Sequence, residues 1–182
     1  MKKFILLLIS AALLMSGCTF SSNDVSSNDT TPNTDEILTT ENNDMYDTLV
    51  TRFMDTNPNT LNQKQLTVAA LITFDAEMMN GGLCQFFTND YYGYAQYVGD
   101  ALTEVGALEM QKHYSSFLSQ NKIDVTKMDS FRILSIEDYL KQLKRFPYEA
   151  FEQTFSEIYE KENLGDILIA YVQRHEDEIL GR

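Results

Sequence analysis

The stretch from Leu66 to Asp90 constrains the fold of this chain more than any other part of the sequence. Residues 66–79 are apolar on nearly all sides of a helix, which is typical of a helix buried around most of its circumference. We therefore predict a central helix here. Gly81 and Gly82 break it, because glycine destabilises a helix interior and readily adopts the positive φ of a helix end. Large apolar side chains that must bury near the break follow at once: Leu83, Phe86 and Phe87.

Three polar side chains lie at this break in apolar surroundings: Glu77, Asn80 and Gln85. One interpretation is that they cap and cross-link the break, because backbone groups at a buried helix end need hydrogen-bond partners. The other interpretation is a binding or catalytic pocket. We favour the structural one, since side-chain amides are poor acids and bases and the stretch holds no second titratable partner.

The residues around the break also resemble the signature of the bacterial DMP-type domain family, named for an acidic DNA mimic protein. The matching positions are Glu77, Asn80, Gly81, Gly82, Gln85, Phe86, Phe87 and Asn89. Weaker similarities follow in residues 100–107 and in the pair Tyr171 and His175, whereas Leu83 stands where the family has phenylalanine. The resemblance covers about residues 45–180 and implies an all-helical fold. It implies no function by itself.

Composition excludes one broad class of function. The chain has 182 residues, with 14 basic against 27 acidic residues and a formal charge of -13. Direct nucleic-acid binding is disfavoured, because a protein must neutralise phosphates to release their counterions. The charge is unevenly distributed: residues 111–145 carry 7 basic and 4 acidic residues, whereas 41–110 carry 2 and 10 and 146–182 carry 3 and 9. A solvated face is the simplest explanation of such runs.

The amino terminus has the pattern of a lipoprotein signal peptide. Lys2 and Lys3 precede an apolar run at residues 4–14, which is too short to span a bilayer. Small residues then come directly before Cys18, as in the lipobox of bacterial lipoproteins. We predict that residues 1–17 are removed and that Cys18 carries the lipid, palmitate included, that anchors the protein in the cell membrane or outer membrane, facing outside the cytoplasm. An ordinary signal peptide cleaved elsewhere is the alternative.

Residues 18–40 are predicted to be the lipidated cysteine and a disordered tether. Residues 19–40 are dominated by Ser, Asn, Asp and Thr, with too few apolar side chains to offset the entropy of ordering. A flexible segment of this length spans roughly 25 Å, enough to hold a domain just off a membrane. Glycosylation or partner binding are other uses of such a composition.

Residues 41–182 are predicted to form one all-α, bundle-like domain of about seven helices without a β-sheet, because helical spacing recurs and strand alternation does not. Thr60 and Gln63 suggest a capping box, which places the start of the central helix at Leu61. Ser135 marks the start of another helix, to which Tyr139, Leu140 and Leu143 give a dry face. No internal repeat is present.

A cluster of tyrosines follows the central helix and is our candidate contact surface: Tyr91, Tyr92, Tyr94 and Tyr97. Tyrosine packs its ring while its hydroxyl stays in water, so it is common at protein interfaces. It also fills the margins of small cores, which is the competing interpretation.

Catalytic, metal and cofactor patterns are absent from the sequence. Cys84 lacks an intramolecular disulfide partner and is expected to be a buried thiol, and neither His113 nor His175 stands in a protease context. His175 and Glu178 supply only a partial metal site, and no phosphate-binding glycine loop occurs. We therefore predict no cofactor, no metal and no enzyme activity; a hydrolase using Glu77 or Cys84 is a remote alternative.

The sequence thus supports an envelope lipoprotein whose acidic helical module binds another protein; a basic partner would complement its charge. The resemblance adds an alternative, in which the acidic surface mimics DNA and, in the manner of an immunity protein, occupies the nucleic-acid site of a basic protein. Export argues against a cytoplasmic target for such a mimic.

Overall fold

A computed structural model describes the backbone of residues 34–181 and the side chains of residues 42–181. The predicted signal peptide, Cys18 and most of the tether lie outside the described residues. Within them every regular element is a helix and no strand occurs, which confirms the all-α prediction. The α-helices are α1 (Thr34–Phe53), α2 (Gln63–Asn89), α3 (Ala95–Val105), α4 (Leu108–Asn121), α5 (Ile136–Arg145), α6 (Tyr148–Tyr159), α7 (Leu164–Arg174) and α8 (Glu176–Leu180). Two 3-10 turns, η1 (Pro58–Thr60) and η2 (Met128–Phe131), join them.

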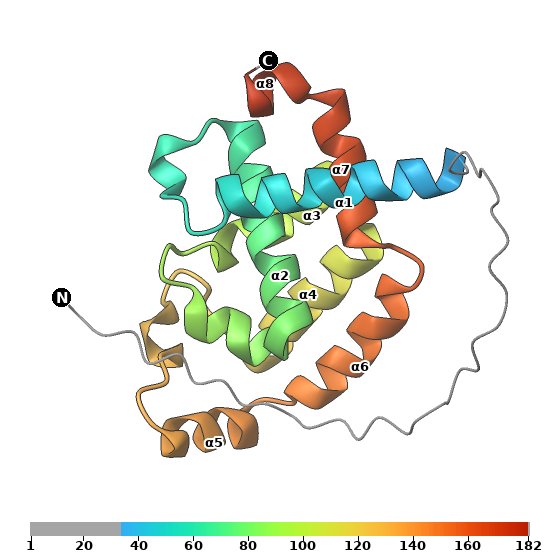
Figure 1. Cartoon of the computed structure of the whole chain (residues 1–182). Coiled ribbons are helices and arrows are strands. Elements are labelled where there is room, and N and C mark those ends of the chain that lie inside the picture. Colours follow the sequence, from blue (N-terminus) through green and yellow to red (C-terminus); the bar gives the residue numbers. More distant parts are fainter. Residues whose placement is uncertain (1–33, 182) are drawn as a thin grey trace, which may run out of the picture. The chain divides into compact units, whose positions relative to one another are not determined.

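Helix α2 is the centre of the domain, as its composition predicts. It runs through the middle of the molecule, with α1, α3, α6 and α7 packed around it (Figure 1). Leu71, Ile72 and Phe74 are fully buried, and the Phe74 ring meets Phe86 edge-on with ring centroids 5.1 Å apart. Among the described side chains, the buried hydrophobic residues lie between Leu49 and Leu180, within one compact unit, so the domain has its own core.

The start of α2 differs from the sequence prediction. Asn62 is the N-cap, and it forms a capping box with Gln65. The predicted box of Thr60 and Gln63 is wrong, because Thr60 already closes the preceding η1 turn through a hydrogen bond from its amide to the carbonyl of Asn57. The first position free to cap a new helix therefore comes two residues later.

The glycine pair kinks α2, as predicted. Gly81 has φ -162° and ψ 18°, and Gly82 has φ 75° and ψ -171°, so the helical hydrogen-bond pattern is interrupted between two helical segments. Gly82 is the position that requires glycine, because a side chain at this φ and ψ is strained.

Helix α1 begins at Thr34, ahead of the predicted start of the helical domain at residue 41. Residues 34–40, which composition assigned to the tether, are therefore helical. Composition averages over a segment and does not resolve a helix end, whereas each residue added to an existing helix gains a hydrogen bond.

Helix α5 contradicts one detail of the prediction. Ser135 caps it as expected, its hydroxyl accepting from the Asp138 amide. Its predicted dry face is not covered, however, since the only buried residue of α5 is Gln142. Tyr139, Leu140 and Leu143 are 37%, 48% and 41% exposed. Periodicity places apolar side chains on one face but does not say whether the domain covers that face.

Among residues 34–181, no helix combines the length and hydrophobicity needed to cross a membrane.

Candidate functional site

Glu77 and Gln85, two of the three polar residues predicted to cross-link the helix break, are hydrogen-bonded to each other, as the structural interpretation predicts, whereas the third, Asn80, is exposed. The carboxylate of Glu77, which is 8% exposed, accepts hydrogen bonds from Gln85 Nε2 at 2.7 Å and Asn89 Nδ2 at 2.9 Å. Glu77 belongs to the first segment of α2, and the two amides belong to the second. The three side chains therefore fasten the segments together across the kink.

Glu152, on α6, completes the break and was not found from the sequence. Its carboxylate accepts a hydrogen bond from the amide of Leu83 at 3.2 Å, at the start of the second α2 segment. A negative charge is favourable there, because helix N-termini present unpaired amides and the positive end of the dipole. A Cβ on Gly82 would lie 2.0 Å from Glu152 Oε1, so a side chain there would displace this carboxylate from the Leu83 amide in addition to straining φ.

The other members of the predicted corner divide between core and surface. Phe86 and Phe87 are buried, as expected from their position after the break. Asn80 and Gly81 are exposed. Asn80 is thus exposed at the surface of the kink, whereas Glu77 is buried, although the two residues are close in the sequence.

Cys84 is a buried thiol, as predicted. Burial and, after it, the nearby charge of Glu152 raise its pKa to about 11. The thiolate is the nucleophilic form of cysteine, so this thiol is unreactive at neutral pH. Tyr148, whose own pKa is raised first by burial and then by Cys84, lies beside it. The chemistry of this site is therefore poorly suited to the remote hydrolase alternative.

Asp75 is the most enclosed carboxylate of α2, at 2% exposure. The hydroxyl of Tyr46, on α1, donates to its Oδ2 at 2.5 Å, and Tyr159, on α6, is a further hydrogen-bond partner. Burial raises the pKa of Asp75, and the two hydroxyls lower it in part. These hydroxyls connect the carboxylate of Asp75, on α2, to α1 and α6.

The tyrosine loop, residues 90–94, connects α2 to α3. Asp90 accepts from the amides of Tyr94 at 2.5 Å and Ala95 at 3.2 Å and so caps α3. Tyr91 and Tyr92 are 66% and 43% exposed, as a contact surface requires. Tyr94 is buried, with its hydroxyl donating to the carbonyl of Thr56, so its assignment to the contact surface is wrong.

Tyr97 is neither exposed, as Tyr91 and Tyr92 are, nor fully buried, as Tyr94 is. It is partly buried and packs against the core, and it lines a hollow of about 140 Å³ together with Asp100 and Glu104. Of the four predicted tyrosines, only Tyr91 and Tyr92 are therefore available as an exposed pair. Sequence spacing does not separate them from Tyr94, because the difference lies in where the loop turns.

A larger hollow, of about 270 Å³, lies between the tyrosine loop and the connector of residues 125–132. Tyr91, Tyr92 and Gly93 form one side, and Lys127, Met128 and Arg132 belong to the other. The Arg132 guanidinium lies 5.9 Å from the centroid of the Tyr91 ring, a cation–π distance. We call this surface, with its two exposed tyrosines, the tyrosine hollow.

Ion pairs organise the connector side of the tyrosine hollow. Lys127 Nζ lies 2.8 Å from Asp124, and Arg132 lies 3.2 Å from Asp129. The Lys127 hydrogen bond, with the Thr126 hydroxyl, lowers the pKa of Asp124 to about 2. These pairs are solvent-exposed and contribute little stability, so their cations can be shared with a bound partner.

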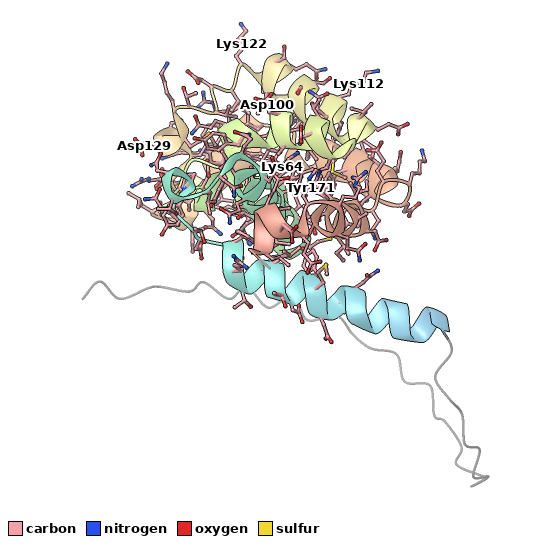
Figure 2. All side chains as sticks on the ribbon, turned by 90° about the horizontal axis from the view of Figure 1, so that it is seen from above. Lys64, Asp100, Lys112, Lys122, Asp129 and Tyr171 are labelled. Atoms are coloured by element: carbon pink, nitrogen blue, oxygen red, sulfur yellow. The ribbon has the colours of Figure 1, made fainter. Side chains whose placement is uncertain are left out.

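Residues from the two weaker similarities to the family lie together in a separate cluster. Lys64 Nζ lies 2.7 Å from Glu104 and 5.2 Å from the centre of the Tyr171 ring, whose hydroxyl donates to the same carboxylate at 3.2 Å. Lys64 and Tyr171 lie side by side in Figure 2. The His175 ring lies 4.8 Å from Tyr171. This cluster joins α2, α3 and α7 and uses its charges internally.

Residues 34–181 contain no group of three or more His, Cys, Asp or Glu side chains arranged to hold a metal ion. His175 Nδ1 lies 3.3 Å from Glu178, as their spacing indicates, but the two remain a pair.

Two contacts of these regions were missed from the sequence for different reasons. Glu152 lies 69 residues after Leu83 in an ordinary acidic helix, and no local signal distinguishes it from its neighbours. Arg132 lies 41 residues after Tyr91, in a connector that composition describes only as polar. The only clue to Glu152 would have been an acidic residue that has no assigned role and could lie opposite the glycine break.

Comparison with known proteins gives one match. A family model described as DMP19-like protein matches residues 59–175, which is more than half of the chain and includes the helix break, the tyrosine loop and all of α7. No curated protein and no solved structure matches the chain.

Proposed function

The chain belongs to the DMP19-like family, and we propose that this member is a lipid-anchored, acidic protein-binding module rather than an enzyme. Its contact surface is the tyrosine hollow. Its anchor is the lipid on Cys18, which holds the helical domain outside the cytoplasm. The helix break is the structural support of the domain and takes no direct part in binding.

The observation that carries this proposal is the exposed pair Tyr91 and Tyr92 beside a preformed hollow. Large aromatic side chains are usually covered, and those left exposed next to a cavity are typical anchors of protein interfaces. Arg132 adds a cation beside the Tyr91 ring, and Arg and Tyr are the residue types enriched where interfaces gain most of their affinity.

The anchoring part of the proposal is supported by the first eighteen residues of the sequence. Basic, apolar and small residues precede Cys18 in the order of a lipoprotein signal. A palmitate analogue supplied to the native host should label the full chain and leave Cys18→Ala unlabelled. An unlabelled wild-type protein that keeps its first methionine in the cytoplasm would contradict the anchor.

The contact surface is tested separately, with the domain beginning at residue 33. Capture from the envelope fraction should be lost when Tyr91 and Tyr92 are both changed to alanine. Leu108, on α4, is 59% exposed and gives a matched control, since Leu108→Ala removes an exposed apolar side chain elsewhere. Equal capture by all three proteins would remove the tyrosine hollow as the contact surface.

A second candidate function is the inhibition of a basic protein by an acidic surface that resembles DNA. The net charge of -13 and the family resemblance favour it. Exposed acidic residues attract basic partners at long range, and this attraction weakens as salt rises. Capture that vanishes in high salt but survives the two tyrosine changes would support this function, whereas salt-resistant capture that requires the tyrosines supports the first.

A further inference from the structure

Helix α5 carries an apolar surface that the domain leaves open. Leu134, just before the helix, is 90% exposed, and Ile136 is 70% exposed. Leu140 and Leu143 continue the same surface at 48% and 41%. Isolated exposed leucines are common, but several adjacent ones mark a binding surface. We call these residues, with Tyr139, the α5 face.

The orientation of α5 shows that this face points away from the domain. Residues 136, 140 and 143 share one side of a helix because they are separated by four and three positions. Gln142 lies on another side and is buried, with its Nε2 donating to the carbonyl of Ser130 at 3.0 Å. In Figure 1, α5 lies at the edge of the molecule, beyond α6 and η2. The helix is thus attached by its polar side.

The charges around α5 are opposite in sign to those of the rest of the chain. Residues 111–145 carry 7 basic and 4 acidic residues, whereas the segments on either side are strongly acidic. Lys141, Lys144 and Arg145 lie in the second half of α5 itself. Lys141 is paired with Glu137 at 3.0 Å, and Arg145 lies 4.9 Å from the centre of the Phe146 ring. Lys144 is exposed at the margin of the apolar face.

We propose that the α5 face lies on the anionic phospholipid surface of the membrane. An interfacial helix buries an apolar face at the boundary of headgroups and acyl chains while its lysines and arginines contact the phosphates. The apolar stripe of α5 and the cations beside it have this arrangement. The acidic segments before and after are repelled by the same surface, so the charge pattern selects which side of the domain meets the membrane.

This inference rests on the proposed lipid anchor, because a helix of ten residues binds a membrane weakly by itself. Anchoring makes the contact intramolecular, so the weak affinity of α5 acts at a high effective concentration. The anchor determines that the domain stays near the membrane, and α5 determines how the domain is oriented on it.

The chain contains no tryptophan, which allows a single reporter to be placed on the face. Leu143→Trp puts the reporter on α5, and Leu108→Trp puts it at a comparably exposed site on α4. The domain from residue 33, which has its own core, is coupled through an added amino-terminal cysteine to vesicles containing a maleimide lipid. Cys84 does not compete in this coupling, because it is buried and its pKa is raised to about 11.

We expect the Leu143→Trp fluorescence to shift to the blue, and to be quenched by brominated acyl chains, on vesicles of phosphatidylcholine with phosphatidylglycerol. Pure phosphatidylcholine should give a several-fold smaller effect, and Leu108→Trp should give none. In the Leu143→Trp background, Lys144→Glu should reduce the quenching several-fold. Lys112→Glu makes the same charge change on an exposed residue of α4, at the edge of the view in Figure 2, and should leave quenching unchanged.

Two results would overturn the proposal. One is the absence of quenching on phosphatidylglycerol vesicles while circular dichroism shows that the coupled domain is folded. The other is a blue shift without vesicles that grows with protein concentration, which would mean that a second copy of the chain covers the face. Chemical coupling makes the readout independent of Cys18, so a failure of the anchor itself is detected separately by the palmitate labelling.

Discussion

The helix break in α2 and the α5 face both bring charged and apolar side chains together, with opposite outcomes. At the break, Glu77 and Glu152 receive hydrogen bonds from Gln85, Asn89 and the Leu83 amide, and the aromatic rings around them are buried. On α5 the apolar residues are exposed and the charges stand in solvent. At the break, the carboxylates find hydrogen-bond donors within the domain, whereas no described residue covers the apolar face of α5.

This difference separates a region that stabilises the fold from a region that is available for association. A buried carboxylate with all its donors inside the domain contributes to one stable structure, and removing a donor leaves a costly unpaired group. Leu134 and Ile136, which are 90% and 70% exposed, contribute little to that structure, because they lose little surface on folding. Substitutions at the break should therefore change stability, and substitutions on α5 should change association.

The largest effect is expected for Gly82→Val. A β-branched residue at φ 75° is strained, and its Cβ would lie 2.0 Å from Glu152. We expect the free energy of unfolding to fall by roughly 3 kcal/mol or more, measured by urea denaturation. Gly106→Ala is the control, because Gly106 also has positive φ, 88°, but nothing lies within 4 Å of a Cβ there. The control should cost about 1 kcal/mol, and equal losses would contradict the role of Glu152.

A smaller loss is expected for Gln85→Leu. The change removes the 2.7 Å hydrogen bond to Glu77 and leaves Asn89 as the other side-chain donor to that carboxylate. The free energy of unfolding should fall by about 1–2 kcal/mol, as for a buried charged group that loses one of its donors. Gln96→Leu makes the same change on the exposed surface of α3 and should be nearly neutral. A Gln85 variant as stable as the wild type would show that the bond across the kink is unimportant.

The third prediction concerns pH. Burial raises the pKa of Asp75 above its ordinary value of 3.8 in the folded state, so the folded state binds its proton more tightly. The resulting stabilisation is complete below pH 3.8 and is lost as pH rises through the folded pKa. Asp75→Asn removes this titration. The stability of the wild type relative to Asp75→Asn should therefore decrease with rising pH over this window, in urea denaturation at several pH values. A constant difference would contradict the raised pKa.

The smallest effect on stability is expected on α5. Ile136→Gln changes an apolar residue that is 70% exposed, so the free energy of unfolding should change by less than about 0.5 kcal/mol. The same substitution should weaken vesicle quenching in the Leu143→Trp protein. If thermal or urea denaturation showed a loss of more than 1 kcal/mol, α5 would belong to the core and the comparison with the break would fail.

Much of the helical framework follows from local patterns. The kink at Gly81 and Gly82 and the Ser135 cap of α5 were predicted, because glycine conformation and capping act within a few residues. The family resemblance, carried mainly by the residues of the break, is confirmed by the match over residues 59–175. The burial of Cys84, Phe86 and Phe87 also followed from their apolar setting.

The remaining features depend on contacts between distant segments. Glu152 meets Gly82 only because α6 packs beside α2, and Tyr94 is buried only because the loop turns its ring toward Thr56. The exposure of Leu140 has the same origin, since an amphipathic pattern is identical whether the domain or another surface covers it. The candidate site was thus located by composition but not divided correctly into core and surface.

The central claim is that the tyrosine hollow, and not the helix break, is the surface through which the anchored domain binds a protein. The most direct test is photo-crosslinking in the native host, with benzoylphenylalanine placed at position 91 of the full chain and, as a control, at position 108. We predict one discrete covalent adduct from position 91 and none from position 108. No adduct from position 91, with an adduct from position 80 at the kink, would contradict the account.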